Sequence, residues 1–218
     1  MTTYSQIQTD LDKWLIRDDI SSDANALASI TNIAQAAINR EVRTVAQEAH
    51  TVLSLIGRSV AAPALFMEVK YMQLDDASSP SAGTLEYKAP EMLRRDNTYQ
   101  NASRTTFYTI EGDGSNAVQF TFAPAGNAST PPQIALGYYT RFATLVDGAD
   151  TNWLLANHYD VYLYAYLRAG AEFIQEDVLE ERFAAKFTAM VAALHKSEQR
   201  KRQRFGSMVA YGNPRGVV

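Results

Sequence analysis

The residues best suited to chemistry gather in one stretch, WLLANHYDVYLYAYLRAGAEFI, which runs from Trp153 to Ile174. The stretch places His158 two positions before Asp160 and adds four tyrosines. A histidine beside a carboxylate is a combination that general acid–base catalysis and metal binding both use. An enzyme site and the buried face of a helix are therefore the two interpretations to compare.

Helical spacing favours the packing interpretation. Asn157 and Asp160 stand three apart, which is the spacing of an N-cap side chain and its reciprocal partner. His50 and His195 lie far away in the sequence, and neither has a metal-ligand spacing. We therefore expect His158 and Asp160 to be structural. The residues that share one face at i, i+3 and i+4 spacing are Tyr159, Tyr162, Leu163, Tyr166, Leu167, Gly170, Phe173 and Ile174.

The other chemical candidates are weaker. Asp75 and Asp76 could form a metal-ligand pair, but we interpret them as residues of the loop DDASSPSAG. The Gly-Asp-Gly sequence at 112–114 is too short for a phosphate-binding loop, and a hairpin turn explains it. Cysteine is absent, which excludes disulfides and thiolate chemistry. No nucleotide-binding, hydrolase or zinc-protease fingerprint occurs, so we expect no catalytic residue, no metal site and no cofactor.

The N-terminal third predicts helices over about residues 3–50. Thr3 and Gln6 give a capping-box pattern, and Asp23 is placed to cap a second, longer helix. The first apolar stripe is Ile7, Leu11, Trp14 and Leu15. The second stripe is Ala26, Leu27, Ile30, Ile33, Ala34, Ala37, Ile38 and Val42.

The C-terminal third predicts a helical hairpin over about residues 151–204. Asp177 and Glu180 give another start signal directly after the tyrosine-rich helix, so the chain turns about Gln-Glu-Asp. The stripe that follows is Leu179, Phe183, Phe187, Met190, Val191 and Leu194. The aromatic residues that we expect to pack the helices are Trp14, Tyr162, Tyr166, Phe173, Phe183 and Phe187, and we expect Tyr162, Tyr166 and Phe173 to be buried.

The middle of the chain, about residues 51–145, changes to the two-residue period of strands. The runs 106–112 and 117–124 alternate on either side of an Asp-Gly turn, and a third run covers 133–142. These three runs predict a three-stranded antiparallel meander. Weaker strand candidates are 51–56, 66–74 and 84–90, and Pro90 opens a short helix that ends at Asp96.

The predicted fold class is therefore α+β. An N-terminal helix pair and a C-terminal helical hairpin form a helical bundle, with a central antiparallel β-rich insertion. We treat residues 1–205 as a single domain. Glycine at 206, 212 and 216 and proline at 214 prevent a helix from continuing, so residues 206–218 are expected to form an extended C-terminal arm.

The charge is concentrated at one place. The net charge of −4 over 218 residues gives no global signature of a nucleic-acid binder. The basic run is Lys196, Arg200, Lys201, Arg202 and Arg204 at the end of the last helix. It is either a solvated helix end or a site for an anionic partner, which would be DNA or an acidic patch on another subunit. The apolar residues of the arm, which would add partner-binding contacts, are Met208, Val209, Tyr211, Val217 and Val218.

Several segments, taken in order, resemble the head-to-tail adaptor family of tailed bacteriophages. They are YSQIQTDLDKWLIRDDI, ITNIAQAAINREVR, VQFTFAPAGNASTPPQIALGYYTRFATL and NWLLANHYDVYLYAYLRAGAEFIQED. The last segment lacks the family's usual proline, and His158 or Tyr159 stands in its place. Each motif is mainly packing chemistry, so their order and spacing from Tyr4 to Arg204 carry the resemblance.

The resemblance implies a structural virion protein at the head–tail junction, made in the host cytoplasm. It implies a homo-oligomeric ring, usually of twelve copies, that docks under the portal protein, contacts tail proteins and lets double-stranded DNA pass, without a catalytic residue. Many Lys and Arg contacts to phosphates would hold DNA tightly. A net-acidic subunit makes fewer such contacts, which suits a conduit through which DNA must pass. The main alternative is a small DNA-binding or regulatory module that uses the basic helix end. An enzyme is the third and least favoured interpretation.

Overall fold

The computed structural model describes residues 2–17, 19–75, 83–95, 105–115, 117–126, 129 and 131–205, with the backbone alone for 202–205. The fold is α+β, as predicted. The chain forms two compact units: a helical unit from the residues before 47 and after 141, and a β-rich unit from Gln47–Arg141. Treating the two units as one adaptor domain stays a prediction.

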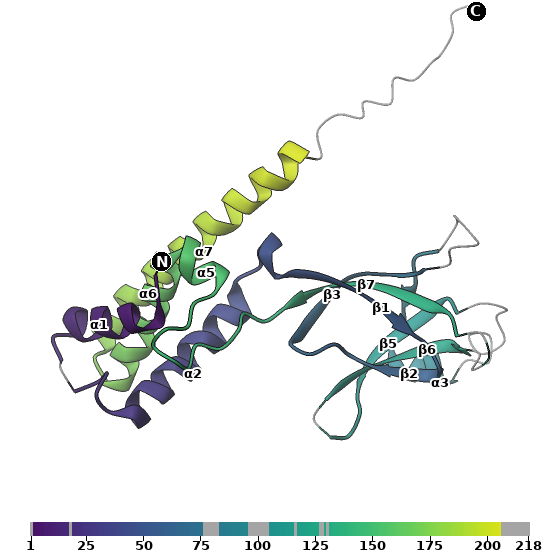
Figure 1. Cartoon of the computed structure of the whole chain (residues 1–218), viewed down its shortest axis with the longest axis horizontal. Coiled ribbons are helices and arrows are strands. Elements are labelled where there is room, and N and C mark those ends of the chain that lie inside the picture. Colours follow the sequence, from purple (N-terminus) through teal and green to yellow (C-terminus); the bar gives the residue numbers. More distant parts are fainter. Residues whose placement is uncertain are drawn as a thin grey trace, which may run out of the picture. The chain divides into compact units, whose positions relative to one another are not determined.

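The helical unit (Figure 1) is a bundle of helices that join the two ends of the sequence. Its elements are α1 Tyr4–Leu15, α2 Ala24–Glu41, α5 Trp153–Asn157, α6 Tyr159–Phe173 and α7 Asp177–Phe205. Helix α6 packs against each of the other four. Helices α1 and α2 pack against α6, although they lie more than 100 positions from it in the sequence, and together they form the core of this unit.

The starts of α1 and α2 differ in how they are capped. The Asp23 side chain accepts hydrogen bonds from the backbone N–H groups of Asn25 and Ala26, which confirms the predicted cap of α2. Thr3 occupies the N-cap position of α1, but its side chain makes no capping hydrogen bond. The expected capping box is therefore wrong; instead, the Gln6 N–H donates to the Thr3 carbonyl oxygen at 3.1 Å.

The end of α2 and the start of α6 also differ from the sequence prediction. Helix α2 ends at Glu41, and a short 3₁₀ turn, η1 Val45–Gln47, leads into the first strand, so the predicted helical region to about residue 50 is too long. Asn157 does not cap α6. It is the last residue of α5, whose N-cap Asn152 accepts a hydrogen bond from Leu155 N–H. The spacing of Asn157 and Asp160 predicted the wrong cap, because the short helix α5 ends at Asn157 directly before α6 begins.

Helix α6 is buried on more than one face, because α1, α2 and α7 all pack against it. Tyr162 and Tyr166 are buried, and the other sides carry small residues such as Ala165 and Ala169. Phe173 contradicts the expected burial, since 47% of it is exposed. It is the final residue of α6, where the chain turns into α7, so part of its ring stays in solvent.

The hairpin of α6 and α7 is confirmed. Gln175 takes a left-handed backbone conformation at φ 59°, and Glu176 N–H returns to the carbonyl oxygen of Ala171 at 3.0 Å. Phe183 and Phe187 of α7 are buried, together with Val191 and Leu194. The predicted stripe of α7 is therefore its core-facing side.

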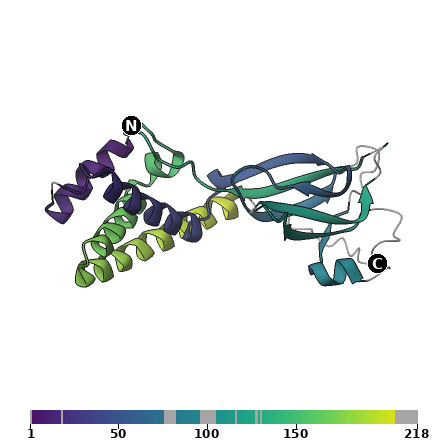
Figure 2. The same cartoon turned by 90° about the horizontal axis from the view of Figure 1, so that it is seen from below.

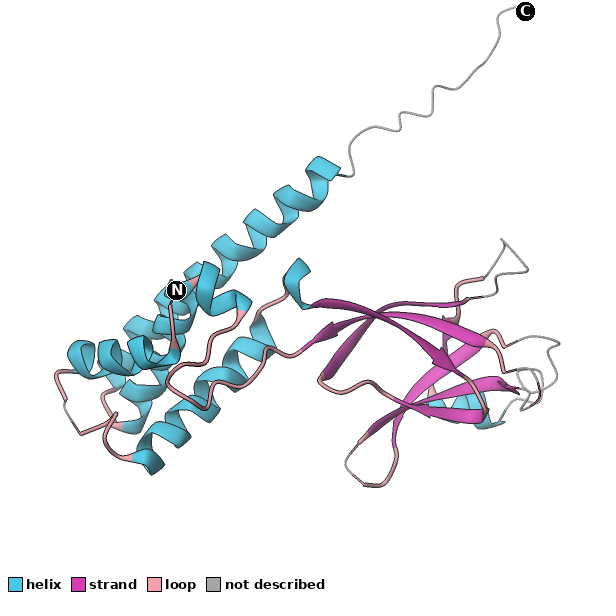
Figure 3. Cartoon of the chain, viewed as in Figure 1, coloured by secondary structure: helices cyan, strands magenta, loops and turns pink. Residues whose placement is uncertain are grey.

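The β-rich unit contains two sheets (Figure 3). Its strands are β1 Glu48–Ser54, β2 Gly57–Ala61, β3 Phe66–Leu74, β4 Glu86–Tyr87, β5 Phe107–Gly112, β6 Val118–Gly126 and β7 Gln133–Thr140. One sheet has the order β1-β7-β3 and the other β2-β6-β5-β4. The short helix α3, Pro90–Arg95, matches its prediction. The core of this unit is Leu55, Met72, Leu74, Leu85, Phe120, Phe122, Ile134, Leu136 and Tyr138.

The predicted three-stranded meander is wrong. Strands β5 and β6 pair antiparallel as expected, but β7 lies in the other sheet, between β1 and β3. The second edge of β6 is taken by β2, a short strand whose sequence, GRSVA, shows no alternation. Because β6 already has two neighbours, it has no edge left for β7. The insertion is also not purely antiparallel, since β4 pairs parallel to β5.

Candidate partner-binding site

His158 and Asp160, the first candidates for catalysis or metal binding, make contacts at the start of α6. His158 is the N-cap residue of α6, and its ring centroid lies 5.4 Å from that of Trp153. The Asp160 carboxylate accepts a hydrogen bond from Val161 N–H at the start of α6. His195 Nε2 accepts from Arg43 N–H at 3.2 Å, while His50 lies in β1 of the other unit. Within the described ranges, no group of three or more His, Cys, Asp and Glu side chains could hold a metal ion.

The hydroxyl groups of Tyr159, Tyr162 and Tyr166 make hydrogen bonds within the helical unit. Tyr159 O–H donates to Asp10, and Tyr162 OH accepts from Asn152 Nδ2 at 2.6 Å. Tyr166 OH accepts a long hydrogen bond from Gln35 Nε2 at 3.4 Å. Burial raises the pKa of Tyr162 to about 12 and also raises the pKa of Tyr159 and of Tyr166. A raised pKa keeps a hydroxyl protonated at neutral pH. These three hydroxyls are therefore not activated to act as nucleophiles or bases.

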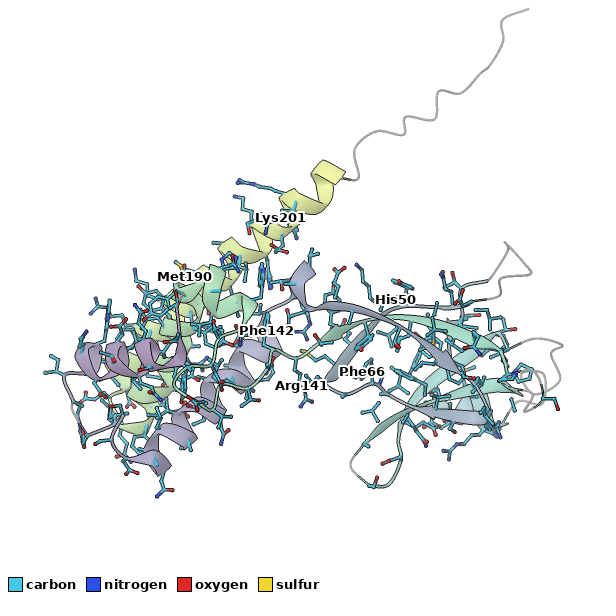
Figure 4. All side chains as sticks on the ribbon, in the orientation of Figure 1. His50, Phe66, Arg141, Phe142, Met190 and Lys201 are labelled. Carbon is cyan, nitrogen blue, oxygen red and sulfur yellow. The ribbon has the colours of Figure 1, made fainter. Side chains whose placement is uncertain are left out.

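The basic end of α7 is the remaining candidate site, and the structure describes part of it (Figure 4). Lys196 and Arg200 are exposed. Arg202 and Arg204 belong to α7 by their backbone, but their side chains are not described. The expected contact residues of the arm lie outside the described residues; these are Met208, Val209, Tyr211, Val217 and Val218.

The Lys201 side chain makes two contacts within the helical unit. Its Nζ donates to Glu198 Oε1 at 2.5 Å and lies 5.8 Å from the centre of the Trp153 ring. The ammonium group therefore has an ion pair on one side and an aromatic face on the other. Among the predicted basic residues whose side chains are described, Lys201 forms an ion pair within the helical unit.

Glu198 is the residue of this region that the sequence did not reveal. It is 3% exposed, and its Oε2 accepts a hydrogen bond from Val45 N–H at 3.0 Å. Burial by itself raises the pKa of Glu198, but the hydrogen bonds from Lys201 and Val45 and the charge of Lys201 outweigh burial and lower that pKa below its usual value. The carboxylate ties the end of α7 to the residues that follow α2.

The aromatic packing residues divide into two groups. Tyr162, Tyr166, Phe183 and Phe187 lie in the core of the helical unit. Trp14 is 49% exposed, although its ring makes edge-to-face contacts with Tyr164 and Phe183, with ring centroids 6.4 Å apart in each pair. Trp14 thus contributes both to packing and to the surface, whereas Phe173 is 47% exposed.

In the described part of the chain, no helix is both long and apolar enough to cross a membrane. No curated protein matches the chain. The family described as SU10 adaptor protein matches residues 2–212, which is nearly the whole chain. The chain therefore belongs to the SU10 adaptor protein family and is a structural adaptor of a bacteriophage virion.

Proposed function

We propose that this chain forms a homo-oligomeric ring under the portal, joins the head to the tail and lets the genome pass. The match to an adaptor family over residues 2–212 carries this proposal. The partners are the portal protein, tail proteins and further copies of the chain, with twelve copies expected in the ring. Its place in the virion is the head–tail junction, after synthesis in the host cytoplasm.

The charge of the subunit supports a conduit for DNA. A net charge of −4 per subunit is multiplied around a ring, which disfavours strong phosphate binding. The exposed cations at the end of α7, among them Lys196 and Arg200, are then available for an acidic protein surface. Complementary charge on two proteins mainly raises their association rate and sets their relative orientation.

The C-terminal segment 196–218 is the proposed portal-docking element. It combines five Lys or Arg residues at the end of α7 with the apolar residues of the arm. Because Glu198 and Lys201 fix the last described turns of α7 to the helical unit, the segment starts from a defined position. A defined starting position reduces the freedom that docking must remove.

Recruitment of a truncated chain tests this assignment. Portal-bearing heads are mixed with the full-length chain, with a chain lacking 206–218, and with His158→Ala as a control. We expect the truncated chain to unfold at the same temperature as the full chain but to be lost from heads, while His158→Ala is recruited normally. Full occupancy of heads by the truncated chain would contradict the assignment.

The DNA-binding alternative is kept because Lys196 and Arg200 are exposed near one another on α7. It is tested by a gel-shift titration with short duplex DNA at several salt concentrations. A DNA-binding module would show binding that weakens steeply with salt. The adaptor proposal expects no shift at physiological salt.

A further inference from the structure

The chain leaves the helical unit along a short segment that α7 holds. Helix α2 ends at Glu41, and residues 42–46 then lead to Gln47, the first residue of the β-rich unit. Helix α2 ends beside α7 (Figure 2), so this segment runs past the side chains of α7. We call residues 42–46 the exit segment.

Two side chains of α7 accept hydrogen bonds from backbone N–H groups of the exit segment. His195 Nε2 accepts from Arg43 N–H at 3.2 Å, and Glu198 Oε2 accepts from Val45 N–H at 3.0 Å. His195 and Glu198 stand at i and i+3, so they lie on the same face of α7. Helix α7 thereby supplies partners for two backbone donors that follow the end of α2. We call this pair of contacts the latch.

The two acceptors of the latch respond differently to acid. A neutral imidazole has one nitrogen that can accept a hydrogen bond, whereas the imidazolium ion carries an N–H donor on both nitrogens. Protonation of His195 therefore places a donor against the Arg43 N–H. Histidine side chains commonly change charge between about pH 8 and 5.

Glu198 keeps its charge over that range. Burial by itself raises the pKa of Glu198, but the hydrogen bonds from Lys201 and Val45 and the charge of Lys201 outweigh burial and lower that pKa below its usual value. The carboxylate therefore stays ionised while a histidine beside it titrates. Of the two acceptors, His195 is the one that loses its ability to accept.

The charges around the latch extend the effect of this protonation. The charged and titratable side chains that the described contacts bring to the latch are Arg43 after α2, His158 at the start of α6, and Glu198 and Lys201 of α7. The protonated His195 ring is attracted to the Glu198 carboxylate, one turn along the same helix. The ring then competes with Val45 N–H for that carboxylate, so both contacts of the latch weaken.

The first residue of the exit segment is held in a way that acid does not change. Val42 N–H donates to the carbonyl oxygen of Ile38 at 2.9 Å, which continues the hydrogen-bond pattern of α2. The Val42 side chain is buried in the core of the helical unit. Neither the backbone bond nor the apolar contact titrates. The effect of acid is therefore confined to the residues between this fixed point and Gln47.

We propose that His195 and Glu198 form an acid-sensitive latch, which holds the exit segment against α7 at neutral pH and releases it when His195 is protonated. The inference goes beyond the proposed function and does not depend on ring formation or portal docking. It gives His195 a conformational role, because its ring nitrogen holds the chain where the chain passes from one unit to the other.

Amide hydrogen exchange of the full chain, followed by nuclear magnetic resonance between about pH 8 and 5, tests the inference. Protection factors, corrected for the pH dependence of intrinsic exchange, are measured at Arg43 and Val45. The Tyr166 amide, in the buried middle of α6, is the internal reference for global unfolding. The chain has three histidines, so glutamine replaces each in turn, in His195→Gln, His158→Gln and His50→Gln. Glutamine keeps an oxygen that can accept but does not titrate.

We expect protection at Arg43 to fall about tenfold on acidification of the wild-type chain, as for loss of one buried hydrogen bond. Protection at Val45 should fall with it, while Tyr166 stays protected. The fall should persist in His158→Gln and His50→Gln and disappear in His195→Gln. In the wild-type chain the carbon shifts of the His195 ring should titrate with the same midpoint, a readout that needs no variant.

Three results would overturn the inference. Protection at Arg43 that does not change with pH in the wild-type chain would show that the contact is not acid-sensitive. A fall that persists in His195→Gln would assign the effect to another group. An equal loss of protection at Tyr166 would show that acid unfolds the whole helical unit rather than releasing the exit segment.

Discussion

The carboxylate of Glu198 accepts a hydrogen bond from the backbone N–H of Val45, 3.0 Å away, and so joins the end of α7 to the residues that follow α2. Both residues belong to the helical unit, and they are 153 positions apart in the sequence. The same carboxylate is paired with Lys201. The contact fixes the start of the proposed docking segment.

Glu198→Gln is expected to lower the free energy of unfolding by about 1–2 kcal/mol at neutral pH, because a buried charge-assisted hydrogen bond is lost. The folded-state pKa of Glu198 is lowered, so this contribution is present above the unfolded pKa near ~4.3 and is lost as the pH falls through the lower folded value. Urea titrations of both proteins at neutral and acid pH measure the difference.

A matched control for that substitution is Glu180→Gln. Glu180 pairs with Arg168 at 3.5 Å, but both side chains are about one-third exposed. Exposed pairs contribute little, so the control should change stability by less than about 1 kcal/mol. If Glu198→Gln destabilised the protein equally at acid and neutral pH, the lowered pKa would not be its cause.

Tyr166→Ala is expected to cost about 3–5 kcal/mol of unfolding free energy, because a large buried side chain leaves a cavity. The Tyr166 ring also contacts the edge of Tyr4, with centroids 6.0 Å apart. Phe173→Ala is the comparison and should cost much less, since half of Phe173 is already exposed. Chemical denaturation measures both, and an equal loss would contradict the assigned burial.

Ile16→Gly is expected to raise the free energy of unfolding by about 0.5–1 kcal/mol. Glycine removes the conformational strain of the left-handed backbone at Ile16. This gain in free energy exceeds the cost of the larger conformational entropy that glycine gives the unfolded chain. Thermal unfolding measures the change, and a lower stability than wild type would count against the assigned conformation.

Gly137→Ala is expected to destabilise the β-rich unit by about 1–3 kcal/mol through overpacking. A Cβ there would lie 2.2 Å from the Tyr71 ring, on the strand that pairs with β7. Gly83→Ala is the control, because a Cβ at Gly83 meets no atom within 4 Å. In a Tyr71→Ser background the cost of Gly137→Ala should largely disappear; a persistent cost would mean that the strain lies in the backbone.

Local signals were sufficient to predict most helices. The stripe of α7 and the Asp23 cap depend on residues within one or two turns, so the sequence displays them directly. Helix α3 and strand β3 were also predicted, because proline at a first turn and apolar residues interleaved with polar ones are local patterns.

Features that depend on distant partners could not be predicted. The edge of β6 is occupied by β2, whose five residues show no strand period, so the meander was a reasonable but wrong inference. Glu198 lies among five cations and resembles a solvated residue; only the approach of Val45 shows why it is buried. Phe173 belongs to the apolar stripe by spacing, but it sits where α6 ends.

The central proposal is that copies of this chain form the ring that joins portal and tail. The most direct measurement is a cryo-electron microscopy reconstruction of the head–tail junction in virions made with and without the chain. The account predicts a ring of density beneath the portal in which the helical unit fits, and loss of that ring together with the tail when the chain is absent. An unchanged junction in virions that lack the chain would contradict it.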